Sequence, residues 1–397
     1  MSATTITELI DALQASPSGA DNLTNSPLIP ENQMILKFPN DPRAIITSRQ
    51  VVSGPDTIPL DYEASGVIVD TRDWSVIAKP PANVAQYATE HVKHSAAYAD
   101  LRGEVYPVRD GTTITLYYHG GSWAMGTRRS LNMFSNVWIG HKKYSEIFKE
   151  CLDHSLASKP RSLGAYLGTL DRDWSYTVGF AHPEHHPAES KPSVWLISCY
   201  SRVQRVFKSG KALTLQDSPC TGLPLYLPTE ETPEDAFREH AKRESADPNY
   251  CGFIVRPGPE DAPGCPIMCR SKRLIARERL LYGVIRGVDS RLKIKYAILM
   301  SLRDPNTALE FAQTFPGLAG TIKHVKGILM GISMEICHRM VMREPDDEGF
   351  AAEFAKKLIT DKQLTSTPRL LSSIVGDLLL AHIDKQWVLS HILGCLA

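Results

Sequence analysis

The sequence lacks a net charge, a long apolar run and a signal sequence. Its 44 lysine and arginine residues equal its 44 aspartate and glutamate residues in number, so no overall field attracts the chain to nucleic acid or to an anionic membrane. No apolar run approaches the roughly 18 residues that suggest a membrane-spanning helix, and no signal-peptide pattern is present. We therefore expect a soluble protein that is not secreted, and any nucleic-acid binding must come from a local basic patch.

Metal-binding cysteine pairs are also missing. The eight cysteines form no CxxC pair, and the nearest two, Cys265 and Cys269, have no matching CxxC or HxxxH partner. His182, His185 and His186 cluster within five residues, but no further Cys or His completes a zinc pattern. The sequence predicts free thiols in a reducing compartment, structural or solvent-facing histidines, and no metal site.

The length and composition are those of a two-domain globular protein. Of the 397 residues, 43% are hydrophobic and 22% are charged, which is ordinary for soluble domains. Because single cores seldom grow beyond roughly 250–300 residues, we expect two domains. Residues 4–13 predict a short amphipathic helix, followed by a Ser-, Pro- and Asn-rich linker that ends near residue 32. That helix could pack on its own domain or dock on a partner.

Further helices are predicted from apolar periodicity and capping residues. Residues 132–156 predict a helix that packs on a sheet, and Thr232 with Pro233 predicts the start of another. Residues 304–397 are helical in period throughout, with apolar stripes at 322–336 and 371–379. Prolines fall between the predicted helices of this region, where they act as breakers, at Pro316, Pro345 and Pro368.

The chain is organised around a predicted β-hairpin in residues 105–130. Residues 112–118 are rich in β-branched and aromatic side chains, His119-Gly120-Gly121 supplies a turn, and residues 122–127 resume an extended pattern. Val108-Arg109-Asp110-Gly111 precedes the first strand, and Thr127-Arg128-Arg129-Ser130 follows the second. This stretch resembles the active-site hairpin of RNA ligases of the phage tRNA-repair type, which carries Lys-x-Asp-Gly and Thr-Arg-Gly-Ser. The resemblance implies a covalent nucleotidyltransferase fold.

The same resemblance extends over roughly residues 35–390 and shows a consistent loss of charged groups. Where the family has an arginine, the nucleophilic lysine, two glutamates and the first lysine of the last motif, this sequence has Ser65, Val108, Gly179, Cys251 and Met268. The residues that match or conserve charge, and so are predicted remnants of nucleotide binding, are Asp110, Gly111, Arg128, Gly252 and Arg270.

These losses weaken both nucleotide binding and catalysis. A charged hydrogen bond to a ligand contributes about 1.5–3 kcal/mol, so five losses amount to roughly 7–15 kcal/mol before non-additivity. A micromolar ligand binds with only about 8 kcal/mol. Valine at position 108 offers no amine to carry AMP, and the lost glutamates remove oxygen ligands for Mg²⁺. We therefore expect no resident cofactor, with ATP and Mg²⁺ required only if the protein is an active ligase.

The resemblance also predicts the architecture. We expect an α+β fold, with a nucleotidyltransferase-like antiparallel β-sheet domain and flanking helices, followed by an all-helical C-terminal domain. The predicted division is an N-terminal helix and linker over 1–32, the ligase-like domain over 33–275 and the helical domain over 276–397.

A basic segment lies where the two predicted domains meet. Between Arg270 and Lys295 there are nine lysine or arginine residues and two acids, interleaved with apolar residues in a helical pattern. One face of that helix could follow RNA phosphates, or it could simply be solvated. The predicted RNA-binding candidates are Arg128, Arg129, Lys272, Arg273, Arg277 and Arg279.

Three functions remain open at this stage. The first hypothesis is a catalytically inactive ligase-like scaffold that binds RNA, a partner protein or itself, and is a viral component in the cytoplasm or virion. The second is an active RNA ligase that uses a relocated lysine, with Lys79 as the first candidate. The third is a purely structural assembly subunit.

Overall fold

The structure is a computed structural model in which the described residues fall into two compact units. The first unit contains the strands and lies mainly before Arg277, and the second contains the helices after it. The predicted domain boundaries at residues 32/33 and 275/276 stay a prediction. The described residues are 4–15, 32–49, 58–88, 102–136, 142–156, 162–183, 186, 191–213, 222–247, 249–257, 266–282, 293–315, 318–342, 349–360, 368–381 and 386–396.

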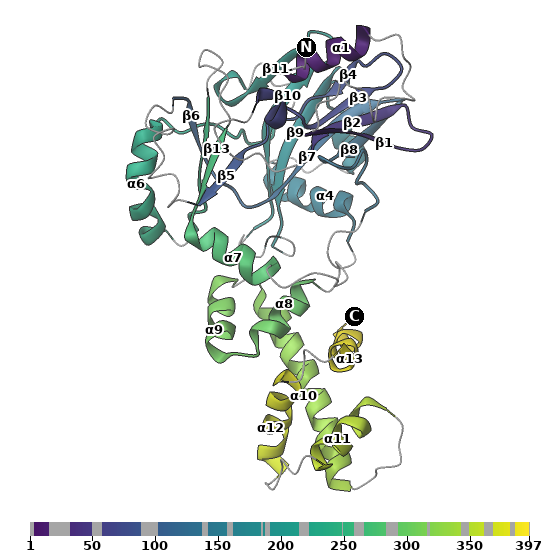
Figure 1. Ribbon diagram of the computed structural model, residues 1–397, viewed down its shortest axis with the longest axis vertical. Helices are drawn as coiled ribbons and strands as arrows, with labels where there is room; N and C mark the ends of the chain where they lie inside the picture. The colour runs from purple at the N-terminus through teal and green to yellow at the C-terminus, as the bar shows by residue number, and fades with distance from the viewer. Residues whose placement is uncertain are drawn as a thin grey trace. The chain divides into compact units, whose positions relative to one another are not determined.

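Three β-sheets build the first unit (Figure 1). The first sheet is antiparallel with the order β1 (Gln33–Lys37), β2 (Arg43–Ser48), β3 (Ser65–Asp70) and β4 (Val76–Ala78). The second sheet is antiparallel with the order β11 (Val206–Ser209), β10 (Ser193–Ser201), β9 (Trp174–Ala181), β7 (Thr112–His119) and β8 (Ser122–Gly126). The third has the order β5 (Ala85–Ala88), β13 (Ile267–Arg270), β12 (Gly252–Arg256) and β6 (Glu104–Pro107).

Strand pairing agrees with the predicted antiparallel fold, with one exception. In the third sheet β13 and β5 run parallel, while its other pairs are antiparallel. The predicted hairpin is confirmed, because β7 pairs with β8 across Gly120 and Gly121. Their φ angles of 59° and 85° are those of a tight hairpin turn that favours glycine at both central positions.

Helices cover the sheets of the first unit. Helix α4 packs on β9 and β10, where the Phe148 and Phe180 rings lie 5.6 Å apart. Helix α6 packs on the third sheet through Phe237 and Phe253, 4.8 Å apart, and its predicted N-cap is confirmed, since Thr232 Oγ1 accepts from Asp235 N–H. The helices of this unit are α1 (Ile6–Ala15), α2 (Pro59–Glu63), α4 (Tyr144–Ser155), α5 (Leu163–Leu167) and α6 (Pro233–Ala246).

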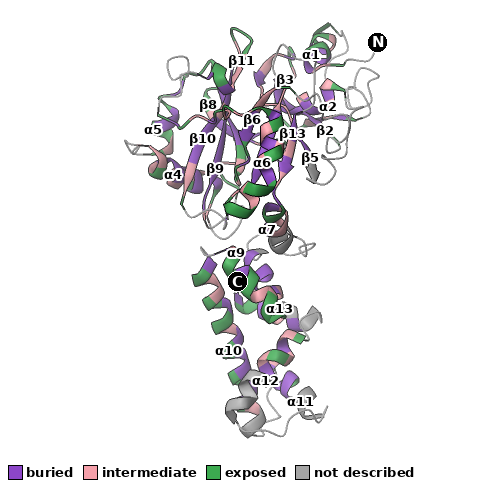
Figure 2. Cartoon of the chain, turned by 90° about the vertical axis from the view of Figure 1, so that its left-hand side faces the viewer, coloured by how far each residue is buried: buried purple, intermediate pink, exposed green. Residues whose placement is uncertain are grey.

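The N-terminal helix packs on its own unit. Ile6, Leu9, Ile10 and Leu13, which form its predicted apolar stripe, are all buried in one cluster with residues of the first sheet and with Trp74. Figure 2 shows that many residues of the strands in this unit are buried as well. The linker predicted after it lies mostly outside the described residues.

The second unit is helical, as predicted. On its longest described helix the apolar stripe is confirmed, since Val325, Leu329, Ile332 and Ile336 are buried in its core. Pro368 is the first residue of a helix rather than a breaker between two, a position where its missing N–H costs nothing. The helices are α8 (Lys293–Ser301), α9 (Pro305–Thr314), α10 (Ala319–Met342), α11 (Phe350–Thr360), α12 (Pro368–Ala381) and α13 (Gln386–Leu396).

Helix α7 (Lys272–Tyr282) carries part of the predicted basic segment and contains the division between the units. Residues 283–292 of that segment lie outside the described part of the chain. Among the helices that the structure describes, none has the length and apolar character needed to cross a membrane.

Packing of α1 on the first sheet can be tested by one cavity-forming substitution. Leu9→Ala should lower the free energy of unfolding of the first unit by about 2–5 kcal/mol, because a fully buried side chain is truncated. Urea denaturation monitored by tryptophan fluorescence measures this free energy. Trp74 serves as a probe because it lies in the same cluster as Leu9. The control Thr7→Ala, exposed on the same helix, should change it by less than about 0.5 kcal/mol. Equal effects of the two substitutions would contradict this packing.

Candidate functional site

The segment that resembles Lys-x-Asp-Gly connects two sheets. Strand β6 ends at Pro107 in the third sheet, and β7 begins at Thr112 in the second. Between them, Val108 N–H donates to the carbonyl of Gly252, at 2.9 Å. The Val108 side chain is 9% exposed. The position of the family's lysine is therefore fixed at a junction of two sheets and faces the interior.

The structure brings together three of the positions that lost charge. Val108 and Cys251 belong to one apolar cluster, and Met268 packs against it. Met268 lies in β13, Val108 in the segment before β7, and Cys251 directly before β12. The other buried members are Tyr106, Ala181, Trp195, Tyr226, Ile254 and Leu274. A packed apolar core thus stands where the resemblance places a nucleophile and charged ligands.

Trp195 occupies the space beside a fourth lost position. Gly179 on β9 pairs with Trp195 on β10, and a Cβ added at Gly179 would overlap the Trp195 indole. A Cβ at Gly111 would lie 2.7 Å from the same ring. A glutamate at position 179 is therefore incompatible with this position of Trp195. From the sequence, Trp195 is recognisable only as part of a strand. Its role depends on pairing with Gly179, which lies 16 positions earlier on another strand.

Two further glycines are required by the backbone. Gly66 has φ +91°, and a Cβ there would lie 2.7 Å from Arg128 Cα. Gly252 has φ +121°, and a Cβ there would overlap the carbonyl of Cys269. Other residues rarely adopt such angles. Both glycines match the family motifs, and in this chain their role is to allow close approach of backbones.

Arginines and aromatic rings surround the apolar cluster. The Arg109 guanidinium lies 4.3 Å from the centre of the Trp195 ring, and that of Arg256 lies 5.8 Å from the centre of the Tyr106 ring. Tyr226 stacks on Tyr106 and donates to the carbonyl of Pro107. Burial raises the pKa of Tyr226 to about 12, against the opposing charges of Arg256 and Arg109. Sequence analysis did not single out Arg256.

Arg128 lies in a second feature of the site, a cavity of about 430 Å³ that also includes Ser65, Gly66 and Arg129. The Arg128 side chain reaches solvent, yet surrounding protein lowers its pKa, and the charge of Arg256 lowers it further. These two properties fit a side chain inside an open depression. The motif residues at the start of β3 and directly after β8 are thus brought together.

The remaining predicted residues are distributed over the first unit and α7. Asp110 is half-buried beside Gly111, and Arg270 is half-buried at the end of β13. Lys272 and Arg273 are exposed at the start of α7. Arg277 is 8% exposed, so it offers little surface to RNA. The side chain of Arg279 is outside the described part of the structure.

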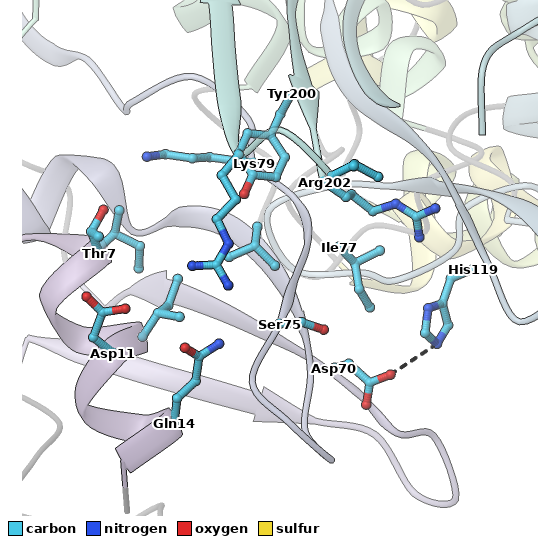
Figure 3. Close-up of a pocket in the computed structure, with 15 residues that line it drawn as sticks. Thr7, Asp11, Gln14, Asp70, Ser75, Ile77, Lys79, His119, Tyr200 and Arg202 are labelled. Carbon is cyan, nitrogen blue, oxygen red and sulfur yellow. Dashed lines mark ion pairs between the residues drawn. The ribbon is translucent and has the colours of Figure 1, made fainter. Parts of the chain in front are cut away.

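Lys79, the candidate relocated nucleophile, lines a different cavity of about 450 Å³ (Figure 3). Thr7, Asp11 and Gln14 of α1 form one side of it, and Lys79 lies with Tyr200 toward the other. In this cavity, His119 Nε2 lies 3.7 Å from Asp70 Oδ2. Burial lowers the pKa of His119, and the charge of Asp70 partly offsets this effect. Neither Val108 nor Cys251 lines this cavity.

The histidine cluster is only partly described. His182 Nε2 lies 2.9 Å from Glu150 Oε2 of α4, and His186 is buried. His185 is not among the described residues. Six cysteines in the described part of the chain are thiols that form no disulfide there, namely Cys151, Cys199, Cys251, Cys269, Cys337 and Cys395.

Comparisons with known proteins agree with the motifs. No family model matches the chain. A protein named "Putative RNA-ligase" from the Badajoz strain of African swine fever virus is 22% identical over 346 residues, which cover 80% of this chain and 75% of that protein. A protein of the same name from a Malawi isolate of this virus is 23% identical over 352 residues, covering 81% and 77%. The predicted resemblance to RNA ligases is confirmed.

Solved structures align over most of the chain. "Putative ATP-dependent DNA ligase from Aquifex aeolicus" has a TM-score of 0.39 and 9% identity, covering 88% of this chain and 95% of that one. "Archaeal ATP-dependent RNA ligase - form 1" has a TM-score of 0.40 and 13% identity, covering 88% and 92%. The predicted α+β class with antiparallel sheets and a helical C-terminal region is confirmed by the fold.

The fit of Trp195 against Gly179 predicts an overpacking effect. Gly179→Ala should lower the free energy of unfolding by about 1–3 kcal/mol, because the added methyl overlaps the indole. Chemical denaturation measures it, and Trp195→Phe should restore part of the loss in the double variant. The control Gly164→Ala, whose nearest neighbour is 3.8 Å away, should be neutral or stabilising. A neutral Gly179→Ala would show that Trp195 does not fill this space.

Proposed function

We propose that this chain, a relative of RNA ligases, is a non-catalytic protein of that class that binds RNA as a scaffold. The observation that carries the proposal is the apolar cluster at the motif positions. Val108 stands where the lysine belongs and Cys251 where a glutamate belongs, and both pack with Trp195. Attachment of AMP needs the lysine amine as a nucleophile. Valine cannot supply it, and the cluster to which it belongs is apolar.

The residues present do not fit Mg²⁺ and ATP in the manner of a ligase. Mg²⁺ prefers carboxylate, carbonyl and water oxygens, and positions 179 and 251 hold glycine and cysteine. The described residues include no group of three or more His, Cys, Asp or Glu side chains that could hold a metal ion. No resident cofactor is part of the proposal.

RNA binding is supported by the cations that border the cluster and α7. Arg109 lies over Trp195, and Arg256 lies near Tyr106. Arg129, Lys272 and Arg273 are exposed. Single-stranded RNA is bound by grooves that combine phosphate contacts with aromatic or guanidinium stacking. The chain has no overall positive charge, so this local arrangement must supply the attraction.

The proposal includes a viral setting, which the source of the two relatives supports. Both relatives named above come from African swine fever virus, and we propose that this chain is likewise a viral component, in the cytoplasm or the virion. As a scaffold it would bring RNA to a partner protein or to further copies of itself. The purely structural alternative differs in having no RNA contact.

The decisive test is formation of a covalent nucleotide adduct. Purified full-length protein incubated with α-labelled ATP or GTP and Mg²⁺ or Mn²⁺ should carry no label on a denaturing gel, while a competent ligase does. Val108→Lys should remain unlabelled, since restoring the amine leaves Trp195 and the lost carboxylate positions unchanged. Circular dichroism must show that this variant is folded, because a charged group at this buried site is costly.

One outcome would overturn the non-catalytic proposal, and a second would overturn its explanation by the residues around Val108. Label on the natural protein that disappears in Lys79→Ala would show a relocated nucleophile and favour the active ligase. Label on Val108→Lys alone would show that the nucleotide site is intact apart from the lysine. The control Lys242→Ala, at an exposed position of α6, checks that any loss of label is specific.

RNA binding should depend strongly on salt. Fluorescence anisotropy with a labelled oligouridylate should show an affinity that falls between roughly 50 and 200 mM NaCl, since phosphate contacts release counterions. Removing both cations in Lys272→Ala/Arg273→Ala should reduce the salt slope by about 1.4, the value for two single-strand phosphates. Arg238→Ala/Lys242→Ala, on exposed α6 positions paired with acids, is the control. Absence of RNA binding would favour the purely structural alternative.

A further inference from the structure

The cavity between β3 and the β7–β8 hairpin has the composition of an anion site. Its volume is about 430 Å³, and no carboxylate is among the residues that line it. Its polar side chains are hydroxyls and guanidiniums, from Ser65, Thr112, Thr113, Thr115, Thr127, Arg128 and Arg129. Guanidinium and hydroxyl groups donate hydrogen bonds, and this combination suits phosphate oxygens.

Ser65 is the observation that points most directly to a ligand. Its residue is 2% exposed, and its Oγ has no hydrogen-bond partner in the structure. A buried hydroxyl without a partner is unfavourable, so nearly all buried polar side chains have one. Ser65 lines the cavity, where a bound acceptor oxygen would satisfy its O–H.

The two arginines of the cavity lack an ion-pair partner among the described residues. Neither Arg128 nor Arg129 makes a described contact with a carboxylate, and the same holds for nearby Arg256. Desolvation by the surrounding protein lowers the pKa of Arg128, and the charge of Arg256 lowers it further. Like charges in such surroundings repel each other, and an anion between them would offset that repulsion.

The backbone holds the cavity in a fixed shape. Gly66 allows β3 to approach the Arg128 backbone, as its added Cβ would lie 2.7 Å from Arg128 Cα. Thr127 N–H donates to the carbonyl of Ser130 at 2.8 Å, which closes the turn that carries both arginines. Ser65 and Arg128 are thus positioned by contacts that do not depend on a ligand, as a preformed site requires.

We propose that this cavity binds a phosphate group of RNA, with Ser65 and Arg128 as its principal hydrogen-bond donors. The inference rests on the proposed RNA binding and assigns it a site. Ser65 departs from the arginine that the family has at this position, so the site is a feature of this chain. A phosphate group could also come from a free nucleotide, and the experiment separates these two sources.

The test combines inorganic phosphate, RNA and ATP on the full chain. Isothermal titration with inorganic phosphate should show binding, and phosphate should displace a labelled oligouridylate in anisotropy. Arg128→Gln should weaken both by about tenfold or more, the size expected for a charged hydrogen bond. Ser65→Ala should weaken both by a few-fold, while its melting temperature stays equal or rises because an unpaired hydroxyl is removed. A merely structural role for Ser65 would instead lower the melting temperature.

Matched controls make the result specific to the cavity. Ser175→Ala removes another buried hydroxyl without a partner, on β9 outside the cavity lining, and should leave phosphate affinity unchanged. Arg238→Gln removes an exposed arginine of α6 and should do the same.

Three outcomes would overturn the assignment. Absence of phosphate binding, or equal effects of Ser65→Ala and Ser175→Ala, would exclude the cavity as a phosphate site. Displacement of phosphate by ATP but not by RNA would assign the cavity to a free nucleotide. Salt-dependent RNA binding that persists unchanged in Arg128→Gln and Ser65→Ala would reject this site while leaving the proposed RNA binding intact. Labelled AMP on the protein would instead reject the non-catalytic proposal.

Discussion

The packing of Trp195 against two glycines is the constraint on which the centre of the first unit depends. The indole covers Gly179 on the neighbouring strand and reaches Gly111 at the start of β7. It also belongs to the cluster that contains Val108 and Cys251. Both sheets that meet at this cluster are therefore joined by apolar contact, where a ligase would need an open, polar site. Burial of these side chains in a closely packed interior stabilises the junction.

Two kinds of motif position behave differently in this chain: the glycines that the backbone requires are kept, and the charged residues that ligand chemistry requires are not. Gly66 and Gly252 keep the family residue, and a side chain at either position would meet another backbone. Ser65 and Cys251, directly before them, do not keep the charged residue that the resemblance assigns. A change at a glycine would disturb the strand arrangement, whereas the neighbouring position accommodates a serine or a cysteine in place of the charged residue. The fold can therefore persist while its ligand chemistry changes.

Local signals predicted the fold well, and contacts between distant segments limited the prediction of the site. The Gly120-Gly121 turn, the Thr232 N-cap and the buried stripe of α1 each depend on neighbours a few residues away, and each is confirmed. Trp195 and Arg256 were missed because their importance comes from other strands. The surroundings of Arg256 include Tyr106 and Arg128, both more than 100 residues earlier. No periodicity or motif spacing in the sequence predicts that residues so far apart along the chain lie close together.

The loss of charged residues has an electrostatic consequence as well as a catalytic one. Glycine and cysteine at positions 179 and 251 remove two negative charges that the resemblance places in the site, and Ser65, Val108 and Met268 remove three positive charges. The five exchanges together therefore lower the net charge of the site by one. Any positive field in this region comes from Arg109, Arg128 and Arg256, and a positive field in a depression attracts polyanions. The exchanged positions account for the loss of ligase chemistry, whereas the proposed contact with RNA phosphates depends on these arginines.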